Sequence, residues 1–131
     1  MDKHRLRQYR FLVKEIAQIE DEKIRLASGM IGAVRITDMP KGSNAVHDPM
    51  AEAAAKLADL SRLLATKLND VISLRIEIER AINSLDEPRE RLLIRLRYIE
   101  GRKWEQIALD MEYDYYWVLK LHKKALNKIS H

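Results

Sequence analysis

Apolar side chains recur in alternating steps of three and four residues near the start of the chain. Between residues 3 and 27 one polar break, Lys23, interrupts a repeat made of Tyr9, Leu12, Ile16, Ile19 and Leu26. This spacing places the repeat on one face of an α-helix, as in a coiled-coil seam. Glycine suits the left-handed position after a helix, so the first helix is predicted to end near Ser28-Gly29.

A second, longer repeat begins after Asp48-Pro49. The Asp48 carboxylate can accept bonds from the free N–H groups of a helix start, and proline at the first position loses only an unpartnered donor. The three-four alternation then continues through Ala53, Leu57, Leu60, Leu64, Lys67, Val71, Leu74, Ile78, Ala81 and Leu85. Neither helix can bury its apolar face alone in water, so the two are predicted to fold back as an antiparallel hairpin.

Residues 28–48 show no helical period and hold three of the four glycines. They are predicted to form a flexible loop, with a short extended piece over residues 34–37. At ~1.5 Å per residue, a helix over residues 3–27 measures about 38 Å and one over residues 49–85 about 55 Å, which leaves an overhang of about 18 Å. The C-terminal domain or another subunit must cover that overhang, which favours a homo-oligomer. The residues assigned to this stem and oligomer seam are Leu57, Leu60, Leu64, Val71, Leu74 and Ile78.

Three shorter helices are predicted after Asp86-Glu87-Pro88. The first ends at Gly101 and has Leu92, Leu93, Leu96 and Ile99 on one face. A helix over residues 104–111 and a turn over residues 112–114 follow. The last helix, residues 115–129, begins after a cap at Asp114 and faces inward with Val118, Leu121, Ala125 and Ile129. Short helix, tight turn and longer basic helix is the helix-turn-helix layout. The predicted fold is all-α, with a helical hairpin stem (residues 1–85) and a helix-turn-helix domain (residues 86–131).

The composition supports an all-α fold, and the excess of positive charge lies in the last third of the chain. Hydrophobic residues make up 47% of the chain and charged residues 34%, with only 4 Gly and 3 Pro, which is typical of long amphipathic helices. Residues 1–88 carry 14 Lys/Arg against 14 Asp/Glu, whereas residues 89–131 carry 10 against 6. A basic end suits binding to a phosphate backbone, and solubility alone is the other explanation for the excess.

The C-terminal part resembles sigma-70 region 4 and the phage late regulators of the RinA and ArpU type that share it. The resemblance is carried by the segment RLLIRLRYIEGRKWEQIALDMEYDYYWVLKLHKKALNKI. Upstream, TDMPKGSNAVHDPMAEAAAKLADL is similar to the loop and second helix of an uncharacterised phage family of this architecture. The resemblance implies a phage or prophage transcriptional regulator that binds double-stranded DNA in the bacterial cytoplasm. RNA polymerase or another phage protein is a further partner class that it implies.

The resemblance also implies which side chains meet DNA. The start of the recognition helix would contact base edges, and nearby lysines would contact phosphates; these residues are Lys103, Tyr115, Tyr116, Trp117, Leu119, Lys120, Lys123 and Lys124. This chain departs from the family pattern at three places. Glu112 stands where such turns usually have glycine, Lys103 replaces a Ser or Thr cap, and an aromatic cluster replaces a mostly polar recognition surface. That cluster leaves DNA contact, protein contact and core packing open as alternatives.

Other classes of function find little support in the residues. The chain has no Cys, so it has no disulfide framework and no thiolate zinc site, and its four His residues are scattered. No catalytic or phosphate-loop motif occurs, and an enzyme, a cofactor or a small-molecule substrate is not expected. No apolar run approaches the roughly 18 residues of a membrane span, and no secretory signal is expected at the start. His122 is interpreted as a polar residue on the last helix. The alternatives to a regulator are a small-terminase-like packaging subunit and a protein adaptor with a degenerate helix-turn-helix.

Overall fold

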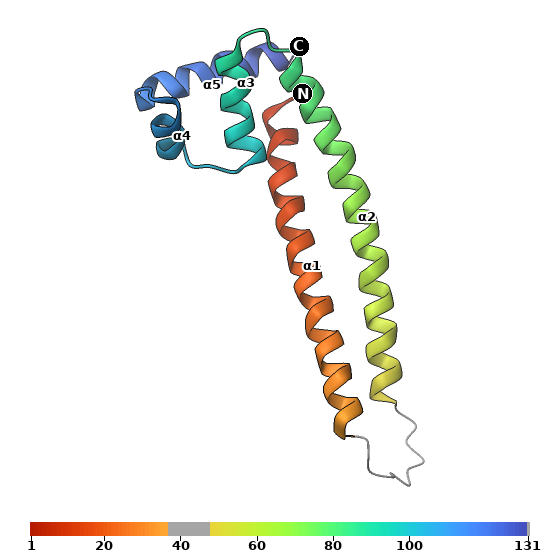
Figure 1. Cartoon of the computed structure of the whole chain (residues 1–131). Helices are drawn as coiled ribbons and strands as arrows, with labels where there is room; N and C mark the ends of the chain where they lie inside the picture. The colour runs from red at the N-terminus through yellow and green to blue at the C-terminus, as the bar shows by residue number, and fades with distance from the viewer. Residues whose placement is uncertain (37–47, 131) are drawn as a thin grey trace. The chain divides into compact units, whose positions relative to one another are not determined.

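The computed structural model describes residues 1–36 and 48–130, the side chains of residues 33–36 excepted, and this part of the chain is helical without any strand. The all-α prediction is therefore confirmed at that level. The elements in chain order are α1 (Lys3–Ile36), α2 (Pro49–Asn83), α3 (Pro88–Ile94), the π-helical turn η1 (Arg95–Ile99), α4 (Trp104–Met111) and α5 (Tyr115–Ile129) (Figure 1). Within the described ranges no helix has the length and apolarity that crossing a membrane requires.

The starts of α2, α4 and α5 agree with the predicted ones. At the start of α2 the Asp48 carboxylate accepts a bond from the Met50 N–H at 3.0 Å, so the predicted cap is formed. At the start of α5 the outcome differs. Asp114 occupies the predicted cap position, but its carboxylate makes no capping hydrogen bond.

The prediction that the first helix ends near Ser28-Gly29 is wrong, because α1 continues to Ile36. Gly29 and Gly32 both lie inside the helix, and a Cβ at either one would meet no atom within 4 Å. Glycine lowers helix stability here without ending the helix, since the three-four repeat continues to the partly buried Met30. The predicted extended piece is wrong over residues 34–36, and the rest of the predicted loop, residues 37–47, lies outside the described residues.

The longer α1 removes the predicted overhang. α1 has 34 residues and α2 has 35, so each is about 52 Å long at ~1.5 Å per residue. Two helices of nearly equal length leave no overhang for a second subunit to cover. Any case for self-association must come from the surfaces that the helices expose.

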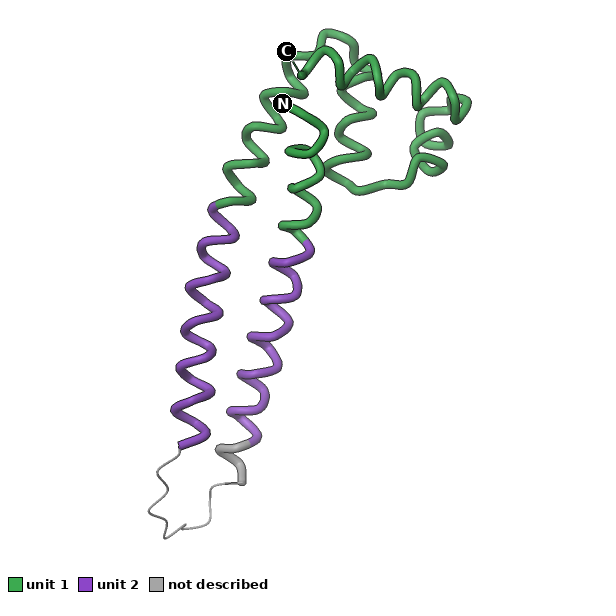
Figure 2. The backbone as a smooth tube through the Cα atoms, turned by 180° about the vertical axis from the view of Figure 1, so that it is seen from behind, with its two compact units in different colours: residues 1–13, 70–131 green, residues 14–69 purple. Residues whose placement is uncertain are grey.

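The chain divides into two compact units. Unit 1 comprises residues 1–13 and 70–131, and unit 2 comprises residues 14–69 (Figure 2). These units cut both long helices, whereas the sequence boundary was drawn after residue 85. The N-terminal turns of α1 and the C-terminal turns of α2 thus belong to the same compact unit as the three short helices.

Unit 1 contains one hydrophobic core. Its buried members come from every helix that enters the unit: Leu6, Tyr9, Leu74, Ile78, Ile82, Leu85, Leu93, Ile94, Leu96, Tyr98, Ile99, Ile107, Ala108, Val118, Leu121, Ala125 and Ile129. Ion pairs join its elements at the rim. Glu79 on α2 binds Arg95 of η1 through two bonds of 2.8 Å each and also accepts from Arg75 at 2.9 Å. These two guanidinium groups lower the pKa of Glu79 to about 2.

The π-helical turn η1 follows α3 directly, and the buried residues of α3 differ from the predicted ones. Glu100 N–H bonds to the Arg95 carbonyl at 3.1 Å, five residues back, which gives the wider π-type turn. The prediction that Leu92 faces the core is wrong, since Leu92 is 45% exposed. Glu90 is buried on the inward face of α3 instead, and a search for apolar residues passes over it.

Gly101 ends this region, as predicted, in the left-handed conformation with φ of 69°. A Cβ at this position would lie 2.6 Å from Arg10 Nε. Arg10 passes this close because its guanidinium donates to the Ile99 carbonyl at 3.1 Å. Two requirements therefore coincide at Gly101: a positive φ and space for the side chain of Arg10.

In unit 2, residues 14–32 of α1 and 49–69 of α2 lie side by side and run in opposite directions (Figure 2). Lys67 Nζ on α2 bonds to Glu15 Oε2 on α1 at 2.7 Å. Ile16 and Ile19 are buried, as members of the first seam should be.

Candidate nucleic-acid interface

The turn between α4 and α5 is set by one left-handed residue. Glu112 has φ of 57° and ψ of 40°, and its N–H bonds to the Leu109 carbonyl at 3.2 Å. Tyr113 N–H then bonds to the Ala108 carbonyl at 3.0 Å, which satisfies the open end of α4. A left-handed non-glycine residue costs on the order of 1 kcal/mol, and this turn carries that strain.

The inward face of α5 agrees with its prediction. Val118, Leu121, Ala125 and Ile129 are all buried. His122 lies on this helix, as interpreted, and it is buried, with only 6% of its surface exposed. It lies on the same inward face, one helical turn after Val118, and so helps to fix the rotation of α5.

His122 is held by two aromatic side chains. Its Nε2 lies 2.6 Å from the Tyr98 hydroxyl of η1, and the Trp104 ring of α4 meets it edge-on with centroids 4.4 Å apart. Burial, with Lys3, Arg97 and Arg7 nearby, lowers the pKa of His122 to about 4. The neutral ring and the Tyr98 hydroxyl therefore share one hydrogen bond, and burial raises the pKa of Tyr98.

An ion pair between an exposed lysine and a buried carboxylate joins the far end of α5 to α3. Lys128 Nζ bonds to both carboxylate oxygens of Glu90, at 2.8 and 3.0 Å, and Glu90 is 1% exposed. Removing Lys128 would leave the buried Glu90 carboxylate without its counterion. Together with His122, this pair determines which face of α5 points to solvent.

The outward face of α5 is basic. The helix contains four lysines and no acidic residue. Lys120, Lys123 and Lys124 are exposed and, among the described residues, take part in no ion pair. Several other cations of unit 1 are paired with acids; for example, Arg102 binds Asp110, and Arg95 binds Glu79.

Aromatic residues occupy the first turn of α5. Tyr115, Tyr116 and Trp117 are 36%, 70% and 48% exposed. Tyr115 and Tyr116 meet edge-on at 5.6 Å, and Trp117 contacts the Tyr113 ring at 6.4 Å. The aromatic residues and the three lysines thus share the accessible side of one helix, while Leu119 is only half-buried.

The predicted Lys103 contact lies on a different element. Lys103 is exposed at the N-cap of α4, where it makes no side-chain capping bond. Glu105 in the first turn of α4 is also exposed. Its negative charge reduces the positive potential that the N-terminus of α4 would otherwise offer to a phosphate.

The six predicted seam residues do not share one environment. Leu74 and Ile78 are buried in the core of unit 1, and Val71 packs against it. Leu57, Leu60 and Leu64 belong to unit 2 and remain half-buried.

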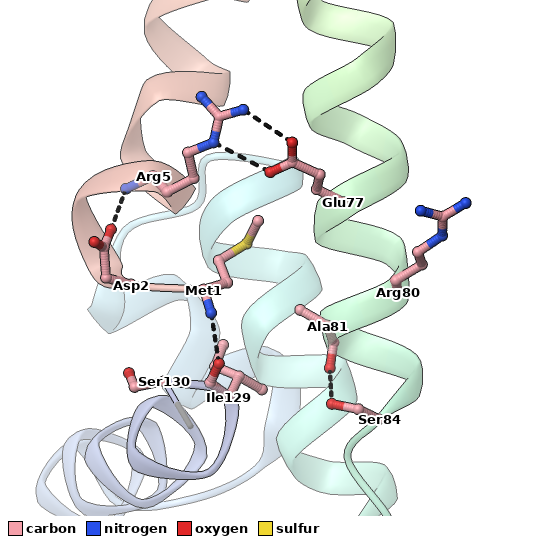
Figure 3. A pocket seen from close by; sticks show the side chains of 9 residues that line it. All are labelled: Met1, Asp2, Arg5, Glu77, Arg80, Ala81, Ser84, Ile129 and Ser130. Atoms are coloured by element: carbon pink, nitrogen blue, oxygen red, sulfur yellow. Dashed lines mark hydrogen bonds and ion pairs between the residues drawn. The ribbon is translucent and has the colours of Figure 1, made fainter.

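Unit 1 has an open hollow near the N-terminus of the chain. It is lined by Met1, Asp2, Arg5, Glu77, Arg80, Ala81, Ser84, Ile129 and Ser130 (Figure 3). Arg5 binds Glu77 through bonds of 3.0 and 3.1 Å, and the Met1 amino group donates to the Ile129 carbonyl at 2.7 Å. These groups bind one another, while Arg80 lies exposed at the same hollow. No three His, Asp or Glu side chains are placed to hold a metal ion in the described ranges.

No protein-family model, curated protein or solved structure matches the chain. The surface chemistry of α5 is therefore the main ground for assigning a function.

Proposed function

We propose that this chain binds double-stranded DNA through α4 and α5, with α5 (Tyr115–Ile129) as the recognition helix of a helix-turn-helix in the major groove. The proposal includes the role that the sequence resemblance implies, a phage-type transcriptional regulator, and a hairpin stem formed by α1 and α2. The observation that carries it is the row of unpaired lysines on a helix without acidic residues.

The exposed polar and aromatic residues of α5 also have the spacing that a helix needs to follow a groove. Tyr116, Lys120, Lys123 and Asn127 lie three or four residues apart on the exposed face of α5. Lysines on such a face release counterions from the phosphate backbone and supply affinity without sequence preference. Tyr116 and Trp117, in the first turn, are placed to meet base edges and thymine methyl groups.

The test is the salt dependence of duplex binding. Replacing Lys120, Lys123 or Lys124 with Ala should reduce the slope of log K against log salt by about one unit each. Lys56→Ala is the matched control, because Lys56 is an exposed lysine of unit 2 and should leave the slope unchanged. Tyr116→Ala or Trp117→Ala should alter which sequences are preferred, since base contacts carry that information.

Equal slopes for the α5 variants and Lys56→Ala would contradict the assignment of these lysines. A folded protein that binds no duplex even at low salt would contradict DNA binding altogether. Both results come from titrations against a random-sequence duplex and a selected one.

The exposed aromatic patch favours a second candidate, a protein adaptor. Tyr116 and Trp117 are 70% and 48% exposed, and aromatic side chains of this kind anchor protein interfaces. Under this alternative Trp117→Ala would abolish binding to a protein partner such as RNA polymerase, and the lysine variants would bind it normally.

A further inference from the structure

The helix pair of unit 2 leaves its own seam partly uncovered. Among the described side chains of this unit, only Ile16 and Ile19 are buried, at 8% and 9% exposure. Leu57, Leu60 and Leu64 of α2 face the same seam and stay half-buried. Two helices form a single layer, which covers apolar side chains from one direction only, and a stable core needs a second layer.

One side of this layer is apolar. Each of its residues comes directly after a member of the three-four repeat of its helix. We call this set the outer stripe: Ala17, Glu20, Ile24, Ala27 and Ile31 on α1, and Ala54, Ala58, Ser61, Ala65 and Leu68 on α2. Its larger members are exposed: Ile24 to 63%, Ile31 to 59% and Leu68 to 38%. Glu20 is its one charged member.

The two halves of the outer stripe belong to the same side. Along an α-helix, each residue points about 100° further round the axis than the one before it. In two antiparallel helices that face each other, the residue after each seam residue therefore points to the same side of the layer. The residues that precede each seam position lie on the opposite side, and they are mostly polar: Glu15, Gln18, Glu22, Arg25 and Gly29 on α1, and Glu52, Lys56, Asp59, Leu63 and Thr66 on α2. One side of the layer suits water, and the other suits a protein surface.

We propose that a second copy of this chain covers the outer stripe, so that two unit 2 layers pack face to face as a four-helix bundle. A surface that meets its own copy about a twofold axis must be complementary to itself, and a nearly uncharged stripe of Ala, Ile and Leu meets that requirement. Residues 14–69 carry 8 Lys/Arg and 8 Asp/Glu, so two copies approach without net repulsion.

The area is sufficient for a dimer. The part of α2 in unit 2 is about 30 Å long, and two packed helices are about 20 Å wide. Each copy would bury about 600 Å², or about 1,200 Å² in total, which reaches the range of stable protein interfaces. Small alanines allow the helices to approach closely, and Ile24, Ile31 and Leu68 supply the larger contacts.

The first experiment compares two adjacent residues of α2. Ala65→Glu puts a carboxylate on the outer stripe, whereas Thr66→Glu puts one on the polar side, and both positions are exposed in the single chain. The native protein and Thr66→Glu should sediment at about twice the chain mass of 15.4 kDa. Ala65→Glu should weaken the dimer by about 100-fold, because it buries an unpaired charge.

A native protein that remains a single chain up to high concentration would overturn the proposal, and so would equal masses for the two variants. Circular dichroism of both variants verifies that they keep their helices.

A second measurement uses the absence of cysteine from the chain. Single Ala58→Cys and Ala65→Cys variants should oxidise to disulfide-linked pairs under mild conditions if two stripes meet, and Thr66→Cys should not. Random linkage at all three positions would count against the interface. None of these measurements contains DNA, so their outcome is independent of the outcome for the proposed DNA binding.

Discussion

Glu112 accepts a backbone conformation that glycine adopts without strain. Its φ of 57° is the one positive value found among the described residues other than glycine. The conformation persists because two backbone bonds, from Glu112 and Tyr113, close the end of α4. Glu112→Gly should therefore raise the free energy of unfolding by up to about 1 kcal/mol, measured by denaturant titration.

The control for this substitution lies in the same helix. Glu105→Gly introduces glycine into the right-handed first turn of α4, where it should lower stability by about 0.5–1 kcal/mol. If both variants lose stability to the same extent, the turn holds no strain that glycine can relieve.

The sequence predicts the burial of some residues and not of others. Val118, Leu121, Ala125 and Ile129 could be assigned inward because apolar side chains at helical spacing define a face by themselves. Glu90 and His122 could not, since a polar residue is buried only where a partner from another element satisfies it. Those partners, Lys128 and Tyr98, are 38 and 24 residues away in the chain.

Helix starts were more predictable than helix ends. Pro49 and Pro88 mark two starts through a local backbone restriction. Glycine is a weak signal for the end of α1, because the apolar repeat continues through Met30 and holds the helix beyond Gly29. The sequence does not predict η1, because a single widened turn has no compositional signal; in the structure its Arg95 binds Glu79 of α2.

Within α2, burial changes sharply over a single turn. Leu74 is 1% exposed, and Ile76 is 47% exposed. Leu74→Asp should lower the free energy of unfolding by at least about 3 kcal/mol, because it buries a charge without a partner. Ile76→Asp makes the same chemical change on the exposed face and should stay within about 0.5 kcal/mol. Thermal denaturation of both variants tests this difference, and similar losses would mean that α2 does not face the core as described.

The stability of the whole molecule should depend on pH in two separate windows. Burial lowers the pKa of His122 to about 4 from its ordinary 6.5, and ion pairs lower that of Glu79 to about 2 from 4.5. Above pH 6.5 neither group favours unfolding. As the pH falls from 6.5 to 4, the unfolded chain binds a proton at His122 that the folded chain does not, so stability falls. Glu79 acts below this range, since its contribution is complete above pH 4.5 and is lost as the pH falls towards 2.

The His122 window is the one that tests the core. Each pKa unit corresponds to about 1.4 kcal/mol, so the loss between pH 6.5 and 4 should reach at most about 3 kcal/mol. His122→Gln should remove this loss and keep the decline below pH 4.5 that Glu79 causes. His4→Gln, at an exposed histidine of α1, should behave like the native protein. Urea titrations at half-unit pH intervals measure all three proteins. A native stability that stays flat from pH 6.5 to 4.5 would mean that His122 takes up its proton in the folded state, and that the ring is not enclosed by Tyr98 and Trp104.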